Sequence, residues 1–191
     1  LVYFGTLSQR SAGARAAIQG ALAASAAVRF LDLNLRSMPE QRVIAEASLH
    51  FAGILKVNEG ELEALFEWFA PGEDAAANEA VFALMHRFGL RRLVLTRGER
   101  GWACYEADPR YVLEGRSPMV TVRDTVGAGD AFAAVLLLGD LRAWPLPTTL
   151  ARAADFSAAV CTLRGAFDEA SPLYRETSAR WTRLDAGAGV G

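Results

Sequence analysis

The chain has 191 residues, enough for one domain with a hydrophobic core. Its residues are 52% hydrophobic and 22% charged, and the net charge is -2, so a disordered chain and a basic surface for nucleic acid are both excluded. Because no apolar run approaches the roughly 20 residues of a membrane-spanning helix, we expect no membrane partner. The two cysteines, Cys104 and Cys161, lack metal-ligand spacing, and we expect a reducing cytoplasm.

Short apolar stretches alternate with alanine-rich segments along the first half of the chain. Residues 1–4, 28–33, 53–57 and 92–96 have the continuous apolar character of strands buried on both faces of a parallel sheet. Helices are predicted between them, over residues 11–26, 39–50, 59–69 and 74–88. With right-handed crossovers, this alternation predicts an α/β fold: a three-layer α/β/α sandwich around a mostly parallel sheet.

The pattern changes after this region. Residues 102–106 and 111–113 predict an antiparallel excursion at one edge of the sheet. A short apolar strand is then expected over residues 119–122, followed by helices over 129–141 and 148–163. The glycine-rich end, residues 184–191, predicts a flexible tail, which leaves residues 1–183 as the folded part.

A glycine-containing segment joins the expected strand 119–122 to the next helix and reads Asp124-Thr125-Val-Gly127-Ala128-Gly129-Asp130. Glycine tolerates backbone angles that other residues resist, so the amides here can converge on an anion at the start of the helix. Asp130, in the first turn, can then accept a proton from an attacking hydroxyl. The segment predicts phosphoryl transfer, although an acid that only stabilises a helix start is the structural alternative.

Two other nucleotide-binding patterns fit the glycines less well. A phosphate-binding P-loop requires Gly-x-x-x-x-Gly-Lys-Ser/Thr, and Lys56, the only lysine, lies in no such loop. A dinucleotide-binding Rossmann site requires a third glycine where Phe132 stands and an acidic residue near Arg152. An NAD-dependent dehydrogenase is therefore the weaker alternative.

Polar segments follow three of the predicted strands, at the strand ends where open parallel sheets bind ligands. They are Asp32-x-Asn34-x-Arg36, Asn58-Glu-Gly-Glu61 and Thr96-x-Gly98-x-x-Gly101. Each has a purely structural explanation: a polar turn, a helix capping box and a tight hairpin turn, respectively. A fourth segment, Cys161-Thr-Leu-Arg-Gly165-Ala166, follows a predicted helix, where glycine is first of all a terminator.

In number and order, these segments resemble the signature motifs of the ribokinase-like sugar kinases, the PfkB family, which phosphorylate a sugar or nucleoside hydroxyl with ATP. The resemblance implies that Asp130 is the general base and that Gly127, Ala128 and Gly129 stabilise the transferred phosphoryl group. It also implies ATP and Mg2+ as cofactors, with Asn58 and Glu61 organising the magnesium ion and its waters.

The same resemblance assigns the remaining segments. Thr96, Gly98 and Gly101 are expected near the nucleotide phosphates and ribose, and Gly165 and Ala166 beside adenine and ribose. A potassium-like monovalent cation is expected between that last loop and the segment that contains Asp124 and Thr125. Asp32, Asn34 and Arg36 are expected near the phosphates and the acceptor.

The form Asp-x-Asn-x-Arg is typical of family members that are similar to fructokinases and 2-keto-3-deoxygluconate kinases. Fructose is therefore the first expected acceptor, with 2-keto-3-deoxygluconate or ribose as alternatives, and a non-catalytic nucleotide-binding module as another. The first residues resemble a strand that lies about a third of the way along the family's sequences. We therefore expect the sugar-gripping part and lid to be absent, these 191 residues alone to be inactive, and the parent enzyme to be a homodimer.

Overall fold

The computed structural model describes residues 1–37, 40–74 and 76–188. The chain divides into two compact units, Leu1–Arg116 and Ser117–Gly191. The first unit is an α/β structure, and the second consists of helices and loops in its described part. None of the helices described is long and apolar enough to span a membrane.

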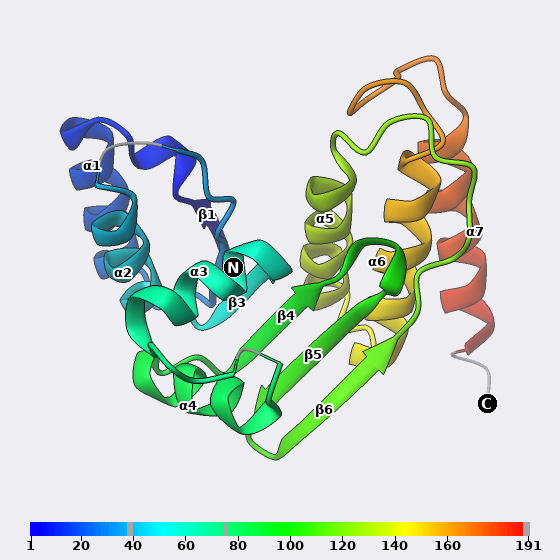
Figure 1. The fold of residues 1–191 in the computed structure, drawn as a ribbon. Helices are drawn as coiled ribbons and strands as arrows, with labels where there is room; N and C mark the ends of the chain where they lie inside the picture. Colours follow the sequence, from blue (N-terminus) through cyan, green and yellow to red (C-terminus); the bar gives the residue numbers. More distant parts are fainter. Residues whose placement is uncertain (38–39, 75, 189–191) are drawn as a thin grey trace. The chain divides into compact units, whose positions relative to one another are not determined.

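The first unit is built on a six-stranded mixed sheet whose spatial order follows the chain (Figure 1). Four strands run parallel: β1 (Val2–Gly5), β2 (Arg29–Asp32), β3 (Ile54–Asn58) and β4 (Arg92–Thr96). β5 (Trp102–Ala107) and β6 (Arg110–Gly115) continue the sheet as antiparallel strands. The predicted α/β class and the antiparallel excursion are both confirmed.

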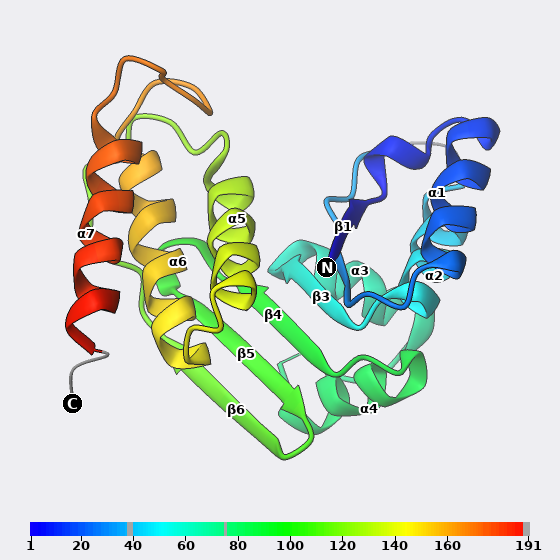
Figure 2. The same cartoon turned by 180° about the vertical axis from the view of Figure 1, so that it is seen from behind.

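Helices cover one face of this sheet, as the opposite views in Figures 1 and 2 show. They are α1 (Ala12–Ala24), α2 (Gln41–Phe51), α3 (Glu59–Phe69) and α4 (Asn78–Phe88), with short 3-10 turns η1 (Leu7–Gln9) and η2 (Gly98–Arg100). Since strand side chains alternate between faces, Leu31 and Leu55 join the core under these helices. Asp32 and Lys56 consequently belong to the opposite face.

The expectation that every parallel strand is buried on both faces is wrong for β1. Only Phe4 of this strand is buried, and Tyr3 is 45% exposed. β1 is the first strand of the sheet and pairs only with β2 among the described strands. An edge strand lacks a neighbour on one side, and an apolar sequence does not by itself distinguish an edge strand from a central one.

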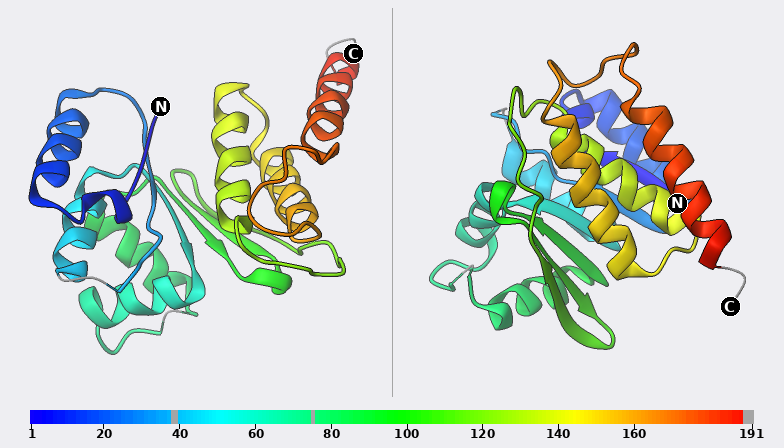
Figure 3. Two further views of the ribbon diagram at one scale, coloured as in Figure 1. Left: turned by 90° about the horizontal axis from the view of Figure 1, so that it is seen from above. Right: turned by 90° about the vertical axis from the view of Figure 1, so that its right-hand side faces the viewer.

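The second unit contains α5 (Ala128–Leu141), α6 (Leu146–Val160) and α7 (Leu173–Ala188), which Figure 3 shows from two directions. Gly139 lets α5 and α6 approach closely, because a Cβ at this position would collide with the Thr149 side chain. The Trp181 ring of α7 packs edge-on against Trp144, with ring centroids 5.5 Å apart. Near the end of α7, Asp185 accepts hydrogen bonds from Arg152 (2.7 Å) and the Trp144 indole (2.9 Å).

Two sequence predictions differ from this unit. Residues 119–122 form no strand, and the side chains of Met119 (101% exposed) and Val122 (56%) lie in solvent. The described sheet ends at β6, and residues 119–122 do not extend it. α7 extends to Ala188, so a helix occupies the first part of the predicted tail, held by the contacts of Asp185; residues 189–191 lie outside the described residues.

We expect Asp185→Ala to loosen the end of α7, because Arg152 and Trp144 lose their shared acceptor. Hydrogen–deuterium exchange should show faster exchange in α7, and Asp155→Ala, an exposed substitution on α6, should not change it. The hydrogen bond from Arg152 is the main cause that lowers the pKa of Asp185 below its ordinary 3.8. The stability that ionised Asp185 adds to the folded state is therefore fully present above pH 3.8. It is lost as the pH falls through the lower pKa that Asp185 has in the folded state. Unchanged exchange in Asp185→Ala would contradict this role.

Candidate functional site

In the second unit, Asp124 connects the two loops that carry most of the predicted nucleotide-site residues. Its carboxylate accepts hydrogen bonds from the backbone N–H groups of Val126 (3.0 Å) and Gly165 (3.0 Å). These two hydrogen bonds, that of Val126 first, lower the pKa of Asp124 below its ordinary value. Asp124 is thus a carboxylate at neutral pH whose oxygens join the two loops, and it is poorly suited to act as a base.

Gly127 determines how closely these loops approach. Its φ of 85° is left-handed, and a Cβ at this position would lie 2.8 Å from both Cα and Cβ of Ala166. The sequence indicated that Gly127 and Gly129 could both take backbone angles that other residues resist. Only Gly127 has a positive φ, because Gly129 already lies inside α5.

The first turn of α5 has the properties of an anion-binding helix start. Gly127 is its N-cap and provides no side chain to accept the free amides. The Ala128 amide donates to the Thr125 carbonyl (3.2 Å), and the first intrahelical bond runs from Ala131 to Gly127 (2.8 Å). The amides of Gly129 and Asp130 therefore precede the hydrogen-bonded helix and can bind an anionic oxygen.

Asp130 occupies this first turn with an exposed side chain. The turn itself is anchored, because the Ser157 hydroxyl of α6 donates to the Ala128 carbonyl (2.8 Å). A solvent-accessible carboxylate on an anchored helix start can receive a proton without moving the anion-binding amides. The geometry of this turn is compatible with the predicted general base.

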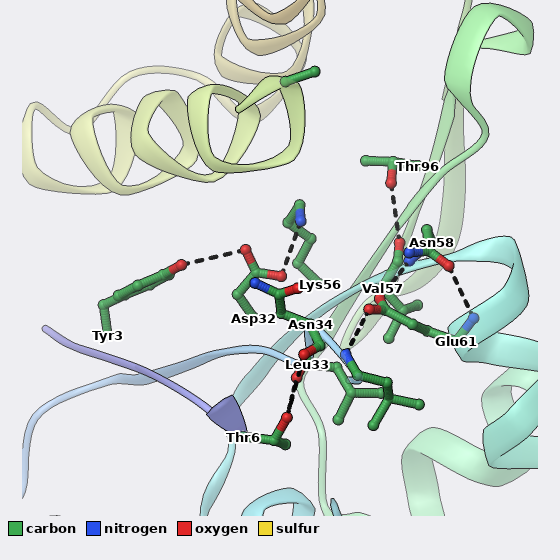
Figure 4. A network of polar contacts seen from close by, with 12 residues as sticks. Tyr3, Thr6, Asp32, Leu33, Asn34, Lys56, Val57, Asn58, Glu61 and Thr96 are labelled. Carbon is green, nitrogen blue, oxygen red and sulfur yellow. Dashed lines mark hydrogen bonds and ion pairs between the residues drawn. The ribbon is translucent and has the colours of Figure 1, made fainter. Parts of the chain in front are cut away.

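In the first unit, Asn58 and Glu61 form a complete capping box at the start of α3. The Asn58 Oδ1 atom accepts from the Glu61 amide and Glu61 Oε2 accepts from the Asn58 amide, both at 2.9 Å (Figure 4). The other Glu61 oxygen accepts from the Leu35 amide, also at 2.9 Å, which ties the polar segment after β2 to α3. The structural explanation of this motif is therefore confirmed.

Burial is the largest influence on Glu61 and raises its pKa, while the Asn58 and Leu35 amides act in the opposite direction. Each carboxylate oxygen already accepts one N–H, which leaves lone pairs for further interactions. Such a pair fits a magnesium ion that keeps several waters and takes other ligands from phosphates. The described part of the chain contains no group of three or more His, Cys, Asp or Glu residues that could bind a metal by itself.

Sequence reasoning missed a buried ion pair between neighbouring strands. Lys56 Nζ lies 2.9 Å from Asp32 Oδ1, and the Tyr3 hydroxyl donates to Asp32 Oδ2 at 3.3 Å (Figure 4). Asp32 and Lys56 are register partners in β2 and β3. A signal was present: a single lysine inside an apolar strand expected to be buried needs a carboxylate partner, and the preceding strand ends with Asp32.

The other residues of the segment after β2 have different surroundings. Asn34 has a left-handed φ of 44°, and its carbonyl accepts from the Thr6 hydroxyl at 3.4 Å. Arg36 is exposed. The structure therefore brings Asp32 into a buried network but leaves Arg36 accessible to a ligand.

The segment after β4 is the expected tight turn. The Thr96 hydroxyl donates to the Val57 carbonyl (3.3 Å) across β3 and β4. Gly98 and Gly101 have positive φ values of 59° and 105°. At Gly101 a Cβ would also collide with the Gly115 carbonyl, so the hairpin itself requires this glycine.

Comparison with known proteins gives the class of this chain. Residues 1–172 match the model of the pfkB family carbohydrate kinases, and the chain belongs to that family. It has the ribokinase-like α/β fold of solved kinases.

No cysteine pair in the described chain is bonded, and Cys104 and Cys161 are free thiols.

Three solved structures illustrate the similarity. Ribokinase II from E. coli, in complex with ATP and Mg2+, is 23% identical; the match covers 95% of this chain and 58% of that one, with a TM-score of 0.78. Aminoimidazole riboside kinase from Salmonella enterica, complexed with aminoimidazole riboside and an ATP analog, is 25% identical (93% and 61% covered, TM-score 0.74). A fructokinase double mutant from Vibrio cholerae, bound to fructose, ADP and potassium, is 22% identical (91% and 58%, TM-score 0.73). The chain thus spans about three fifths of the length of these proteins.

Gly127→Ala should destabilise the second unit by about 2–4 kcal/mol, because it adds left-handed backbone strain to a collision with Ala166. Gly165→Ala is the matched control: its φ is 75°, but nothing lies within 4 Å of the added Cβ. We expect the control to lose only about 1 kcal/mol. Urea denaturation measures both changes in the free energy of unfolding, and equal losses would show that the Gly127–Ala166 contact is unimportant.

Proposed function

We propose that this chain is the nucleotide-binding part of an enzyme that transfers the γ-phosphoryl group of ATP to a sugar hydroxyl. The observation that carries the proposal is the start of α5, where Gly127 leaves the first turn without a side-chain cap and Asp130 is exposed beside the free amides. Family membership supports the same reaction class. The similarity of the ATP-bound structures lends support to the nucleotide as donor.

In this reaction the sugar hydroxyl oxygen bonds to the γ-phosphorus while the bond from that phosphorus to the bridging oxygen of ADP breaks. Asp130 takes the hydroxyl proton, and ADP leaves with the bridging oxygen. The amides of Gly129 and Asp130, placed by Gly127 and Ala128, stabilise charge on the transferring group. Magnesium, when bound, neutralises phosphate charge, and Asn58 and Glu61 are the residues that would hold it through its waters.

The remaining nucleotide contacts follow from the loops around these groups. We assign Thr96, Gly98 and Gly101 to the phosphates and ribose. Gly165 and Ala166 are assigned to the adenine side, and the hydrogen bond between Asp124 and the Gly165 amide supports a fixed loop there. A monovalent cation beside Asp124 and Thr125 is part of the proposal, supported by the potassium-bound fructokinase.

Fructose is the acceptor that we propose first. The Asp32-x-Asn34-x-Arg36 form supports it, as does the fold similarity to a fructose-bound fructokinase. Exposed Arg36 is available to the acceptor or to the nucleotide phosphates, whereas Asp32 is engaged with Lys56 and Tyr3. A panel of fructose, ribose and 2-keto-3-deoxygluconate, assayed for ATP-dependent phosphorylation, distinguishes the acceptors.

Asp130→Asn should lower kcat for sugar phosphorylation by about 10²–10⁴ and leave ATP affinity unchanged, since the base is lost and the amides remain. A coupled ADP-release assay on the active enzyme measures kcat, and calorimetry on the 191-residue chain measures ATP affinity. Asp140→Asn, exposed at the far end of the same helix, is the control. Undiminished turnover in Asp130→Asn would rule out the assigned base.

Glu61→Gln should remove most of the gain in ATP affinity that Mg2+ provides, because the amide cannot supply a negative charge to the hydrated ion. Glu63→Gln, an exposed neighbour on α3, should retain it. In the wild type this gain should shrink as pH falls through the raised pKa of Glu61, since protonation neutralises the carboxylate. Calorimetric titrations with and without Mg2+ over this pH range measure the effect, and a magnesium gain that persists in Glu61→Gln would contradict the role.

A further inference from the structure

The buried ion pair between Asp32 and Lys56 has no role in the reaction described above. Its side chains are only 3% and 7% exposed. Both belong to the sheet face opposite α1–α4, because their strand neighbours Leu31 and Leu55 lie in the core under those helices. The Asp32 carboxylate and the Lys56 ammonium group are therefore both buried from solvent, at the ends of β2 and β3.

Stability alone gives no reason for charges at these positions. On the same face, Phe30 and Ile54 are apolar and 2% exposed, so apolar side chains are accommodated two residues earlier in each strand. A buried ion pair loses much of its attraction to desolvation, and an apolar pair of similar size is often as stable. A role in ligand binding accounts for charges that stability does not require.

Asp32 is not a free ligand. Its Oδ1 atom accepts from Lys56 Nζ (2.9 Å) and its Oδ2 atom accepts from the Tyr3 hydroxyl (3.3 Å), as Figure 4 shows. Both oxygens are thus directed at side chains of the neighbouring strands β1 and β3. This geometry suits a residue that orients the Lys56 ammonium group.

The Lys56 ammonium group has N–H donors beyond the one that Asp32 accepts. An ammonium group carries three N–H bonds, and one of them is directed at Asp32. Lys56 precedes Asn58 by two positions on β3, so both residues belong to the same face at the carboxyl end of the strand. The Lys56 charge also acts on Glu61, where it favours the ionised carboxylate. The cation therefore lies within electrostatic reach of the proposed magnesium residues.

We propose that Lys56 binds the phosphate chain of the nucleotide, and that Asp32 and Tyr3 are positioning residues that hold its ammonium group for this purpose. The inference rests on the proposed function in taking ATP as the ligand. Its chemistry, however, requires only a polyphosphate anion. Inorganic triphosphate is therefore a probe that separates the two proposals.

Lys56 is the only lysine in the sequence, so lysine labelled with carbon-13 at Cε gives a single side-chain NMR signal that reports on this residue. Titration of the wild-type chain with inorganic triphosphate and with ATP, each with Mg2+, should shift this signal in a saturable way. No substitution is needed, so folding of a variant cannot obscure the result. Binding of both anions without any shift of the lysine signal would overturn the inference.

Substitutions then separate function from structure. The double variant Asp32→Leu/Lys56→Met replaces the ion pair with an apolar pair and should melt near the wild-type temperature. Its affinity for triphosphate and ATP should fall about tenfold or more, as for the loss of a charge-assisted hydrogen bond. Arg183→Met removes an exposed charge on α7 and should leave affinity unchanged. A folded double variant with wild-type affinity would show that the pair is purely structural.

Tyr3→Phe tests the positioning role. It should weaken triphosphate binding about two- to fivefold in the wild-type background, by loss of one hydrogen bond to Asp32, and have no effect in the double variant. An equal effect in both backgrounds would remove Tyr3 from the proposal. In the full-length parent enzyme, Lys56-dependent triphosphate binding without sugar phosphorylation would refute the proposed kinase function and keep this inference. A chain that binds neither anion refutes both.

Discussion

A carboxylate that accepts backbone N–H groups from two separate segments organises each unit of this protein. Glu61 receives the amides of Asn58 and Leu35, and Asp124 receives those of Val126 and Gly165. Each interaction fixes the relative position of two loops at strand or helix ends, where ordinary secondary-structure hydrogen bonds are not available. The candidate site residues lie in or beside these loops, so their placement depends on the two carboxylates.

The same type of interaction gives the two carboxyl groups different electrostatic states. Glu61 is buried, and desolvation raises its pKa despite the two amide donors. Asp124 is more accessible, and its hydrogen bonds lower its pKa. A carboxyl group with a raised pKa gains more when a cation approaches, whereas one with a lowered pKa remains a constant part of the loop. This difference agrees with a metal-associated role for Glu61 and an architectural role for Asp124.

Three aspartates of this chain differ in the groups that surround their carboxylates. Asp32 accepts hydrogen bonds from Lys56 and Tyr3, Asp124 accepts them from backbone amides, and Asp130 alone of the three is exposed at a helix start. The family match leaves the acceptor sugar open, since kinases with different acceptors share this fold.

The sequence by itself determined the features that depend on local interactions. The helix at residues 59–69 and the strand at residues 92–96 are found where periodicity and the capping box predicted them, because these signals act within a few residues. The glycine helix start at Gly127 is local in the same way. Tertiary structure decided what depends on distant neighbours: the exposure of β1, the missing strand at residues 119–122 and the extension of α7 to Ala188. It also decided that Asp32 and Lys56 meet, 24 residues apart in the chain, because strand register is set by the packing of the whole sheet.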